Sequence, residues 1–297
     1  MKCDLCPRKC LVDRKKGEKG ICGQTENLKV ARAALHFWEE PCISGDAGSG
    51  AVFFSGCPLH CVFCQNENIA NGTVGKEISL ERLVDIFLEL QEKRANNINL
   101  VTPGHFVPQI VKALDQARKE GLTLPVVYNT SSYETVDTIK MLEGYVDIYL
   151  PDFKYMSPVL SKKYSHAPDY AEVAKAAIAE MVRQTGKAVF VNGDEDNLIL
   201  SGTIVRHLTL PGCMADSMQI VKYLHDTYGD KIYISIMNQF TPLSNLEKYP
   251  ELNRRITDVE YETLVDYAID IGIENGFIQE GNTAEESFIP AFDCEGV

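Results

Sequence analysis

The sequence has no long hydrophobic run. No segment approaches the ~18 consecutive apolar residues that a membrane-spanning helix needs, although 45% of the 297 residues are hydrophobic. The first ten residues also lack the apolar core and small-residue cleavage site of a secretory signal. We therefore expect a cytoplasmic protein with no membrane partner.

Basic residues are also scarce. The chain has 29 Lys and Arg against 42 Asp and Glu, which gives a formal net charge of −13. This excess of negative charge opposes electrostatic attraction to nucleic acid, so we do not expect a nucleic-acid partner. Cysteine, in contrast, is abundant, with 10 residues that fall mostly into two groups. In a reducing compartment, grouped cysteines hold metal or carry out chemistry more often than they form disulfides.

From residue 51 onward, short apolar runs alternate with longer segments of helical pattern. The expected strands are Ala51–Ser55, Ile98–Thr102, Pro125–Thr130, Val146–Pro151, Ile204–Leu210 and Ile232–Met237. The expected helices are Leu80–Arg94, Pro108–Glu120, Tyr133–Leu142, Tyr170–Gln184, Ala215–Tyr228 and Asp258–Ile271. Such alternation predicts an α/β fold with parallel strands and right-handed crossovers, here a partial TIM-like (β/α)6 barrel. A doubly wound open sheet is the alternative.

The predicted domain organisation follows from where this alternation of strands and helices begins. We expect residues 51–297 to form the barrel with a C-terminal extension, and residues 1–50 to form a small Cys-rich metal-binding lobe and linker.

Three cysteines follow the first expected strand closely: Cys57, Cys61 and Cys64. In a βα barrel such a loop lies at the catalytic face, where three thiolates can each ligate one iron of a [4Fe-4S] cluster. The fourth iron then stays open to chelate a small molecule. Phe63 can shield the cluster. The alternatives are a structural zinc site or chance clustering, although zinc sites generally use paired Cys or Cys/His knuckles.

The Cys-x3-Cys-x2-Cys spacing with an aromatic residue before the last cysteine resembles the radical S-adenosylmethionine superfamily. Within it, the segments 38–45, 99–105 and 149–155 look like the pyruvate formate-lyase activating enzymes, in particular a branch with an added N-terminal cysteine lobe. The resemblance implies a [4Fe-4S] cluster and S-adenosyl-L-methionine as cofactors. It also implies reductive cleavage of S-adenosylmethionine to methionine and a 5′-deoxyadenosyl radical that abstracts hydrogen from a C–H bond.

Two strand ends carry charged candidates for cofactor binding. Asp152 and Lys154 are two residues apart and so share a face, and they match an Asp-x-Lys that contacts the cofactor in activating enzymes. Arg206 matches an arginine that lies near the cofactor carboxylate, which a guanidinium binds bidentately. The alternatives are a solvent-facing ion pair at Asp152 and Lys154, and ordinary packing for Arg206. For His207 we favour packing.

Three further cofactor-binding candidates depart from the family pattern. Thr102 and Gly104 stand where most relatives carry a Gly-Gly-Glu segment whose backbone binds the methionyl amine. The backbone acceptors survive this change and the glutamate does not. Thr130 lies in a segment that replaces an Asp-Thr-Asn pattern of some activating enzymes. No catalytic side chain is assigned.

The second cysteine group is at the N-terminus and comprises Cys3, Cys6, Cys10 and Cys22. Four thiolates suffice for a tetrahedral site on a segment with no core of its own. Because they satisfy both chemistries, zinc and a second iron–sulfur cluster both stay open, beside the case of no metal.

The sequence predicts a radical S-adenosylmethionine oxidoreductase of the activating type, which abstracts hydrogen from a glycyl residue of a partner protein. The alternative substrate is a peptide, amino acid or small molecule. A non-catalytic iron–sulfur or zinc protein is the rival from another class, although a closed electron carrier normally uses four ligands rather than three. The predicted activity also implies a low-potential electron donor such as flavodoxin or ferredoxin.

Overall fold

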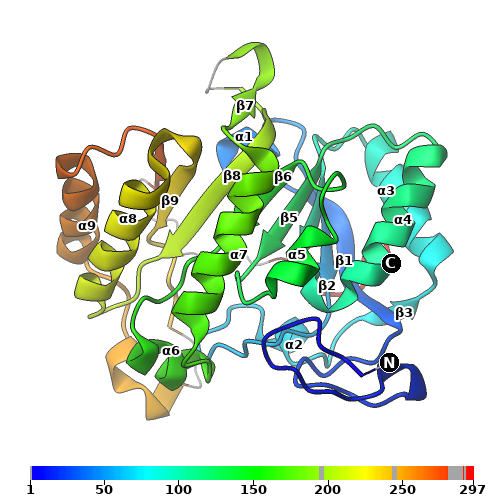
Figure 1. Ribbon diagram of the computed structural model, residues 1–297, viewed down its shortest axis with the longest axis horizontal. Helices are drawn as coiled ribbons and strands as arrows, with labels where there is room; N and C mark the ends of the chain where they lie inside the picture. Colours follow the sequence, from blue (N-terminus) through cyan, green and yellow to red (C-terminus); the bar gives the residue numbers. More distant parts are fainter. Residues whose placement is uncertain (1, 194–196, 243–245, 280–289, 291) are drawn as a thin grey trace.

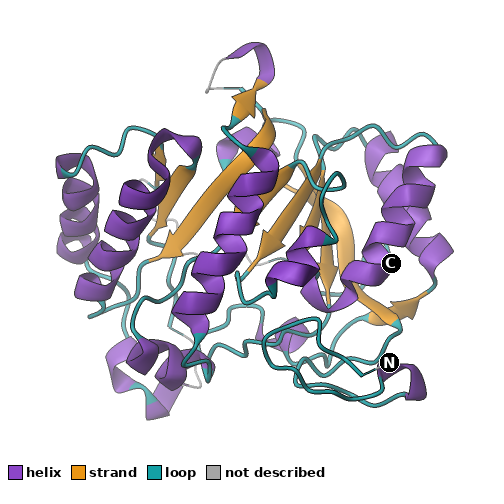
Figure 2. Cartoon of the chain, in the orientation of Figure 1, coloured by secondary structure: helices purple, strands orange, loops and turns teal. Residues whose placement is uncertain are grey.

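A single curved sheet organises the computed structural model, which describes residues 2–193, 197–242, 246–279, 290 and 292–297. Its strands are β1 (Leu28–His36), β2 (Ser49–Phe54), β3 (Lys76–Ile78), β4 (Ile98–Val101), β5 (Val126–Thr130), β6 (Ile148–Pro151), β7 (Val189–Phe190), β8 (Ile199–Leu208), β9 (Tyr233–Met237) and β10 (Gly276–Ile278). Their order is β10-β9-β8-β6-β5-β4-β2-β1-β3, and β7 pairs with β8 outside this path. Figure 2 shows the strands as one layer behind the helices.

The α-helices are α1 (Pro41–Ser44), α2 (Glu67–Ala70), α3 (Leu80–Glu92), α4 (Val107–Lys119), α5 (Val136–Lys140), α6 (Pro158–Ser165), α7 (Tyr170–Thr185), α8 (Met214–Tyr228) and α9 (Asp258–Asp270). Local sequence fixes several of their starts. The Ser79 side chain accepts the Arg82 N–H at the start of α3, and Thr257 and Glu260 form a capping box at the start of α9. In Figure 1, α5 and α7 lie in front of the sheet, with α3 and α4 on one side and α8 and α9 on the other.

The predicted α/β fold with a mostly parallel sheet is confirmed. Strands β2, β4, β5, β6, β8, β9 and β10 pair in parallel, whereas β1 pairs antiparallel with both β2 and β3. An open sheet of this kind, with helices outside, is consistent with a partial TIM-like barrel. Because residues alternate between the faces of a strand, Val205 packs in the helix-covered core while Arg206 faces the barrel interior.

The N-terminal part of the chain contributes more to the sheet than the sequence indicates. The segment 28–36 forms β1, and the Cys-rich segment that precedes it lies with α2 at the carboxyl ends of the strands, at the bottom of Figure 1. Helix α1 lies at the opposite end of the sheet. At the C-terminus, Cys294 and Glu295 hydrogen-bond to the backbone of β1. No helix in the described residues is long and apolar enough to cross a membrane.

Candidate functional site

The cysteine loop, residues 56–66, follows β2 directly. Gly56 and His60 have positive φ angles of 91° and 52°, so the chain turns sharply twice in this loop. The position of Gly56 also demands glycine on steric grounds, because a Cβ there would lie 2.4 Å from the carbonyl oxygen of Cys22. The turns bring Cys57, Cys61 and Cys64 to one cavity.

Hydrogen-bond donors and aromatic rings surround the three sulfurs. The Ser165 hydroxyl donates to Cys61 Sγ at 3.0 Å, and the Leu59 N–H donates to Cys57 Sγ at 3.5 Å. Phe63 is buried and lies edge-on to Phe240, with ring centroids 5.8 Å apart. Such donors stabilise thiolates, and the apolar packing screens them from solvent. Phe63 lines the same cavity as the three sulfurs, and its shielding of a cluster stays a prediction.

The cavity has a volume of about 260 Å³. It lies at the carboxyl ends of the strands, where βα barrels place their active sites. Thr102, Thr130, Asp152, Lys154 and Arg206 line it together with the three cysteines. In the described part of the chain no fourth cysteine lines this cavity.

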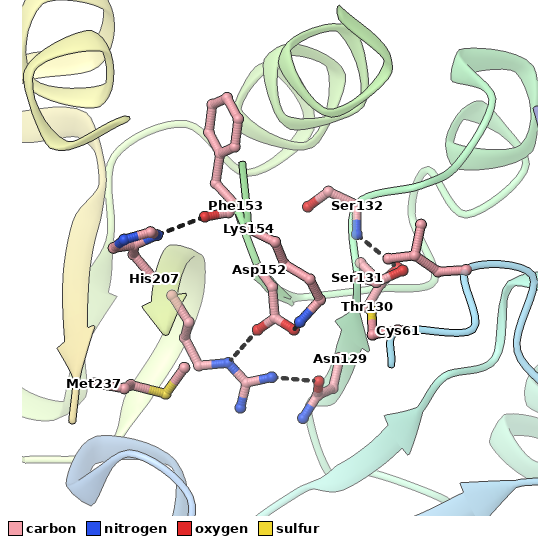
Figure 3. Close-up of polar contacts among 12 residues, drawn as sticks. Cys61, Asn129, Thr130, Ser131, Ser132, Asp152, Phe153, Lys154, His207 and Met237 are labelled. Carbon is pink, nitrogen blue, oxygen red and sulfur yellow. Dashed lines mark hydrogen bonds and ion pairs between the residues drawn. The ribbon is translucent and has the colours of Figure 1, made fainter. Parts of the chain in front are cut away.

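A charged network spans the cavity wall. Arg206 Nε donates to Asp152 Oδ1 at 3.0 Å, Arg206 Nη1 to Glu39 Oε2 at 3.0 Å, and Arg206 Nη2 to Asn129 Oδ1 at 2.7 Å. Lys154 Nζ pairs with the other Asp152 oxygen at 2.6 Å. Figure 3 shows Asp152, Lys154 and Asn129 directed toward one another from neighbouring strand ends. The network joins β5, β6 and β8 to the segment between β1 and α1.

Burial and pairing act in opposite directions on these groups. Burial alone would raise the pKa of Asp152, but Lys154 and Arg206 lower it below its ordinary value. Burial likewise disfavours the cation of Lys154, and Asp152 raises its pKa on balance. Both groups therefore stay charged. Asp152 and Lys154 form an ion pair, but a largely buried one in the cavity rather than the solvent-facing pair of the alternative interpretation.

Thr130 is held from behind by a buried carboxyl group. Its hydroxyl donates to Glu134 Oε1 at 2.8 Å, and burial raises the pKa of Glu134 to about 7. Gly104 does not line the cavity; it packs on Glu134, where a Cβ would lie 2.4 Å from each carboxyl oxygen. Thr102 reaches the cavity with a positive φ of 55°.

His207 is packed as the sequence suggests. Its Nδ1 lies 2.8 Å from the Phe153 carbonyl oxygen, and burial lowers its pKa to about 4, so the ring is neutral near pH 7 and Nδ1–H is the donor. Figure 3 shows the ring directed at Phe153.

The N-terminal cysteine lobe, residues 2–24, packs against the cysteine loop. Arg8, between Cys6 and Cys10, donates to the carbonyl oxygens of Pro58, Ser165 and His166. The His60 ring nitrogen lies 2.8 Å from the Ile21 carbonyl oxygen. The lobe therefore holds the backbone that positions the sulfurs.

Two of the four N-terminal cysteines, Cys10 and Cys22, lie close together in this lobe. The Ile21 N–H donates to Cys10 Sγ at 3.2 Å, and a Cβ at Gly20 would lie 3.3 Å from Cys10 Sγ and 3.8 Å from Cys22 Sγ. In the ranges that the structure describes, no three His, Cys, Asp or Glu side chains are close enough together to hold one metal ion.

Sequence reasoning missed Glu39 and Asn129 as members of the site. Both line the cavity and bind Arg206, and the Asn129 amide also donates to Glu39 Oε1 at 3.0 Å. Asn129 lies near the end of β5, one residue before the predicted Thr130, and its position was the available signal. Glu39 precedes every expected strand, so no strand-end argument pointed to it.

The donor set fits the group that the spacing predicts. Three thiols without a fourth, beside buried anions and cations, suit a cluster with one open iron and a ligand that carries both amine and carboxylate.

Comparison with known proteins gives matches to a family model and to a curated relative. Residues 51–196 match the family model described as "Radical SAM superfamily". The chain is 27% identical over 272 residues to "Uncharacterized protein MJ0674" of Methanocaldococcus jannaschii, a match that covers 90% of this chain and 74% of that protein.

Solved structures support the fold. The likeness to Streptococcus suis SuiB bound to the precursor peptide SuiA has a TM-score of 0.50 at 12% identity; it covers 75% of this chain and 46% of SuiB, so the chain spans less than half the length of that protein. A domain of the pyruvate-formate lyase-activating enzyme of Bacteroides vulgatus gives a TM-score of 0.39 at 11% identity, covering 59% of this chain and 91% of that one. The likeness to the activating-enzyme branch stays a prediction.

Proposed function

We propose that the protein is a radical S-adenosylmethionine oxidoreductase, a proposal supported by the match of residues 51–196 to the Radical SAM superfamily model. Cys57, Cys61 and Cys64 would hold a [4Fe-4S] cluster, and S-adenosylmethionine would bind in the cavity that they line. The observation that carries the proposal is the convergence of three thiols and the Arg206 network on one cavity.

When bound, the cluster and S-adenosylmethionine supply a 5′-deoxyadenosyl radical through one-electron reductive cleavage. The chain's own residues bind and orient. Arg206 offers a guanidinium to a carboxylate, Asp152 offers oxygens to ribose hydroxyls or an amine, and the backbone at Thr102 and Thr130 offers polar groups at two neighbouring strand ends. Phe63 and the rings around it exclude water from the sulfurs.

The N-terminal cysteine lobe supports the same site. We propose that Cys3, Cys6, Cys10 and Cys22 bind zinc or a second iron–sulfur cluster, and that this metal orders the lobe that carries Arg8. Iron and zinc analysis of a Cys6→Ala variant separates the two metals, because only a second cluster would take iron with it. The reductant that the reaction needs would be a low-potential carrier of the flavodoxin or ferredoxin class.

Two substrate classes follow from the sequence, a glycyl residue of a partner protein and a peptide, amino acid or small molecule. A second cavity of about 820 Å³ favours the second class, because it offers space for a small ligand beside the cofactor cavity.

The test is formation of 5′-deoxyadenosine. We expect the anaerobically reconstituted protein to bind iron and to convert S-adenosylmethionine to 5′-deoxyadenosine and methionine when dithionite is added. A Cys61→Ala variant should lose both iron at this site and the product. Cys294→Ala is the matched control, since Cys294 lies on the C-terminal segment that packs on β1.

A non-catalytic iron–sulfur protein would give a different result. It would bind iron and would form no 5′-deoxyadenosine above the level without protein, and that outcome would refute the proposal. A zinc protein would show stoichiometric zinc at the Cys57, Cys61 and Cys64 site, which metal analysis of Cys61→Ala detects.

A further inference from the structure

A second cavity adjoins the cofactor cavity. Its volume is about 820 Å³, and it is lined by helix α1 and the turn after it, by the end of β9 and by β10. Trp38, Glu39, Arg206, Met237 and Gln239 line both cavities, so one set of side chains forms the partition between them. A molecule in the second cavity therefore lies next to the site proposed for S-adenosylmethionine.

Glu40 is the unusual group in this cavity. Its Oε1 accepts the Ser235 hydroxyl at 2.8 Å, and in the described ranges it has no ion-pair partner within 4.0 Å. Burial raises its pKa above the ordinary value. The neighbouring cation is Arg206, and it forms its ion pairs with Glu39 and Asp152 and not with Glu40. A buried carboxylate with only a hydroxyl partner is compensated best by a cation that arrives from outside.

Carboxylates outnumber cations in the described lining of the cavity. Glu39, Glu40 and Asp46 face a single Arg206 across the described lining. An excess of carboxylates in a partly enclosed space attracts a positive ligand and repels anions.

Apolar surface accompanies these carboxylates. Phe37 and Trp38 have 49% and 63% of their surfaces exposed, and Ile278 of the edge strand β10 has 51% exposed. All three line the second cavity, with Phe277 beside them. Large exposed apolar side chains around a cavity indicate a surface that binds another molecule. The aromatic faces also suit a cation attached to an apolar stem.

We propose that the second cavity is the substrate compartment and that Glu40 binds a protonated primary amine of the substrate, whose apolar portion lies against Trp38 and Phe277. This inference rests on the proposed function and specifies its substrate class. A free amine and a lysine side chain within a peptide present the same group, so the test has an arm for each.

The single tryptophan makes the cavity directly observable. Trp38 is the only tryptophan in the chain, so intrinsic tryptophan fluorescence reports on the partition between the two cavities. The anaerobically reconstituted protein is titrated with phenethylamine and, separately, with the peptide acetyl-Gly-Lys-Gly-amide. The neutral counterparts are 2-phenylethanol and the same peptide with norleucine in place of lysine. We expect saturable changes in emission with the amines, and affinities at least about tenfold weaker with the neutral counterparts.

Glu40→Gln removes the charge and preserves the shape of the side chain. We expect it to weaken amine binding about tenfold or more and to leave the affinity for the neutral counterparts unchanged. Asp46→Asn is the matched control, because it alters an exposed carboxylate at the rim of the same cavity and should change the affinity less than about threefold. If Glu40→Gln does not fold, the comparison of charged and neutral probes on the unaltered protein decides the question.

Equal affinity for amines and neutral counterparts, unchanged amine binding in Glu40→Gln, or no binding of either amine would overturn the inference. Tighter binding of the lysine peptide assigns the amine to a peptide, and tighter binding of phenethylamine assigns it to a free amine. Formation of 5′-deoxyadenosine is measured on the same preparations. Its presence without amine binding refutes this inference alone, whereas its absence with amine binding refutes the proposed function alone.

Discussion

The carboxyl group of Glu134 is expected to make the protein less stable as the pH rises. It is fully buried behind Thr130, its Oε1 accepts hydrogen bonds from the hydroxyls of Thr130 and Tyr128, and its Oε2 has no partner in the described residues. Among the described residues no cation lowers its pKa, and burial raises the pKa to about 7 from the ordinary 4.5. Glu134→Gln replaces this group by one that does not titrate.

The magnitude follows from the two pKa values. The folded protein keeps the proton up to a pH of about 7, whereas the unfolded chain releases it near 4.5. Between these values unfolding releases a proton, so the free energy of unfolding falls as the pH rises. Each unit of pKa corresponds to about 1.4 kcal/mol, so the full loss is about 3 kcal/mol, of which about 2 kcal/mol falls between pH 5.5 and pH 8.

Urea unfolding at pH 5.5 and pH 8 measures this difference in the original protein and in Glu134→Gln. We expect the stability of the variant relative to the original to improve by about 2 kcal/mol between the two pH values. Glu92→Gln, at an exposed position of α3, is the control and should show no such change. A pH dependence that is the same in all three proteins would refute the reasoning.

Two further substitutions test the site. Arg206→Ala should cost about 3–5 kcal/mol of stability, because it leaves the Glu39 carboxylate without a cation and Asp152 with Lys154 alone. Urea unfolding should show this loss of stability, and calorimetric titration should show weaker binding of S-adenosylmethionine. A cost in stability under about 1 kcal/mol would contradict the reasoning. Gly56→Ala should lower the iron bound per chain and cost about 1–3 kcal/mol of stability, because Gly56 has a positive φ and the added Cβ would collide with the Cys22 carbonyl oxygen. Gly121→Ala is the control, with a φ of 107° and nothing within 4 Å of the added Cβ; equal iron loss in both would show that the contact with Cys22 does not matter.

The sequence predicted the parallel part of the fold well because its strands are short and fully buried. Strands β2, β4, β5, β6 and β9 begin and end within two residues of the expected bounds. Strand β1 was not predicted, since the alanine-rich segment 28–36 has no clear strand or helix period. Strand β10 is too short to give a pattern.

Part of the candidate site could likewise be predicted from the sequence, and part could not. The cysteine spacing and the polar strand ends indicated Cys57, Asp152, Lys154 and Arg206, because chemistry at a barrel's carboxyl edge is a local property of the sequence. Glu39 and Glu40 enter the barrel only because β1 pairs antiparallel with β2 and directs the next segment across the interior. That placement depends on tertiary structure.

The groups that meet at Arg206 already neutralise one another, two carboxylates against two cations. A ligand that binds among these groups must add no net charge, or a buried charge is left uncompensated. A zwitterion meets this demand with its own two ends, whereas a simple phosphate or a simple metal cation does not. Because the charges of this cavity wall already balance, the site selects small molecules by their net charge as well as by their shape.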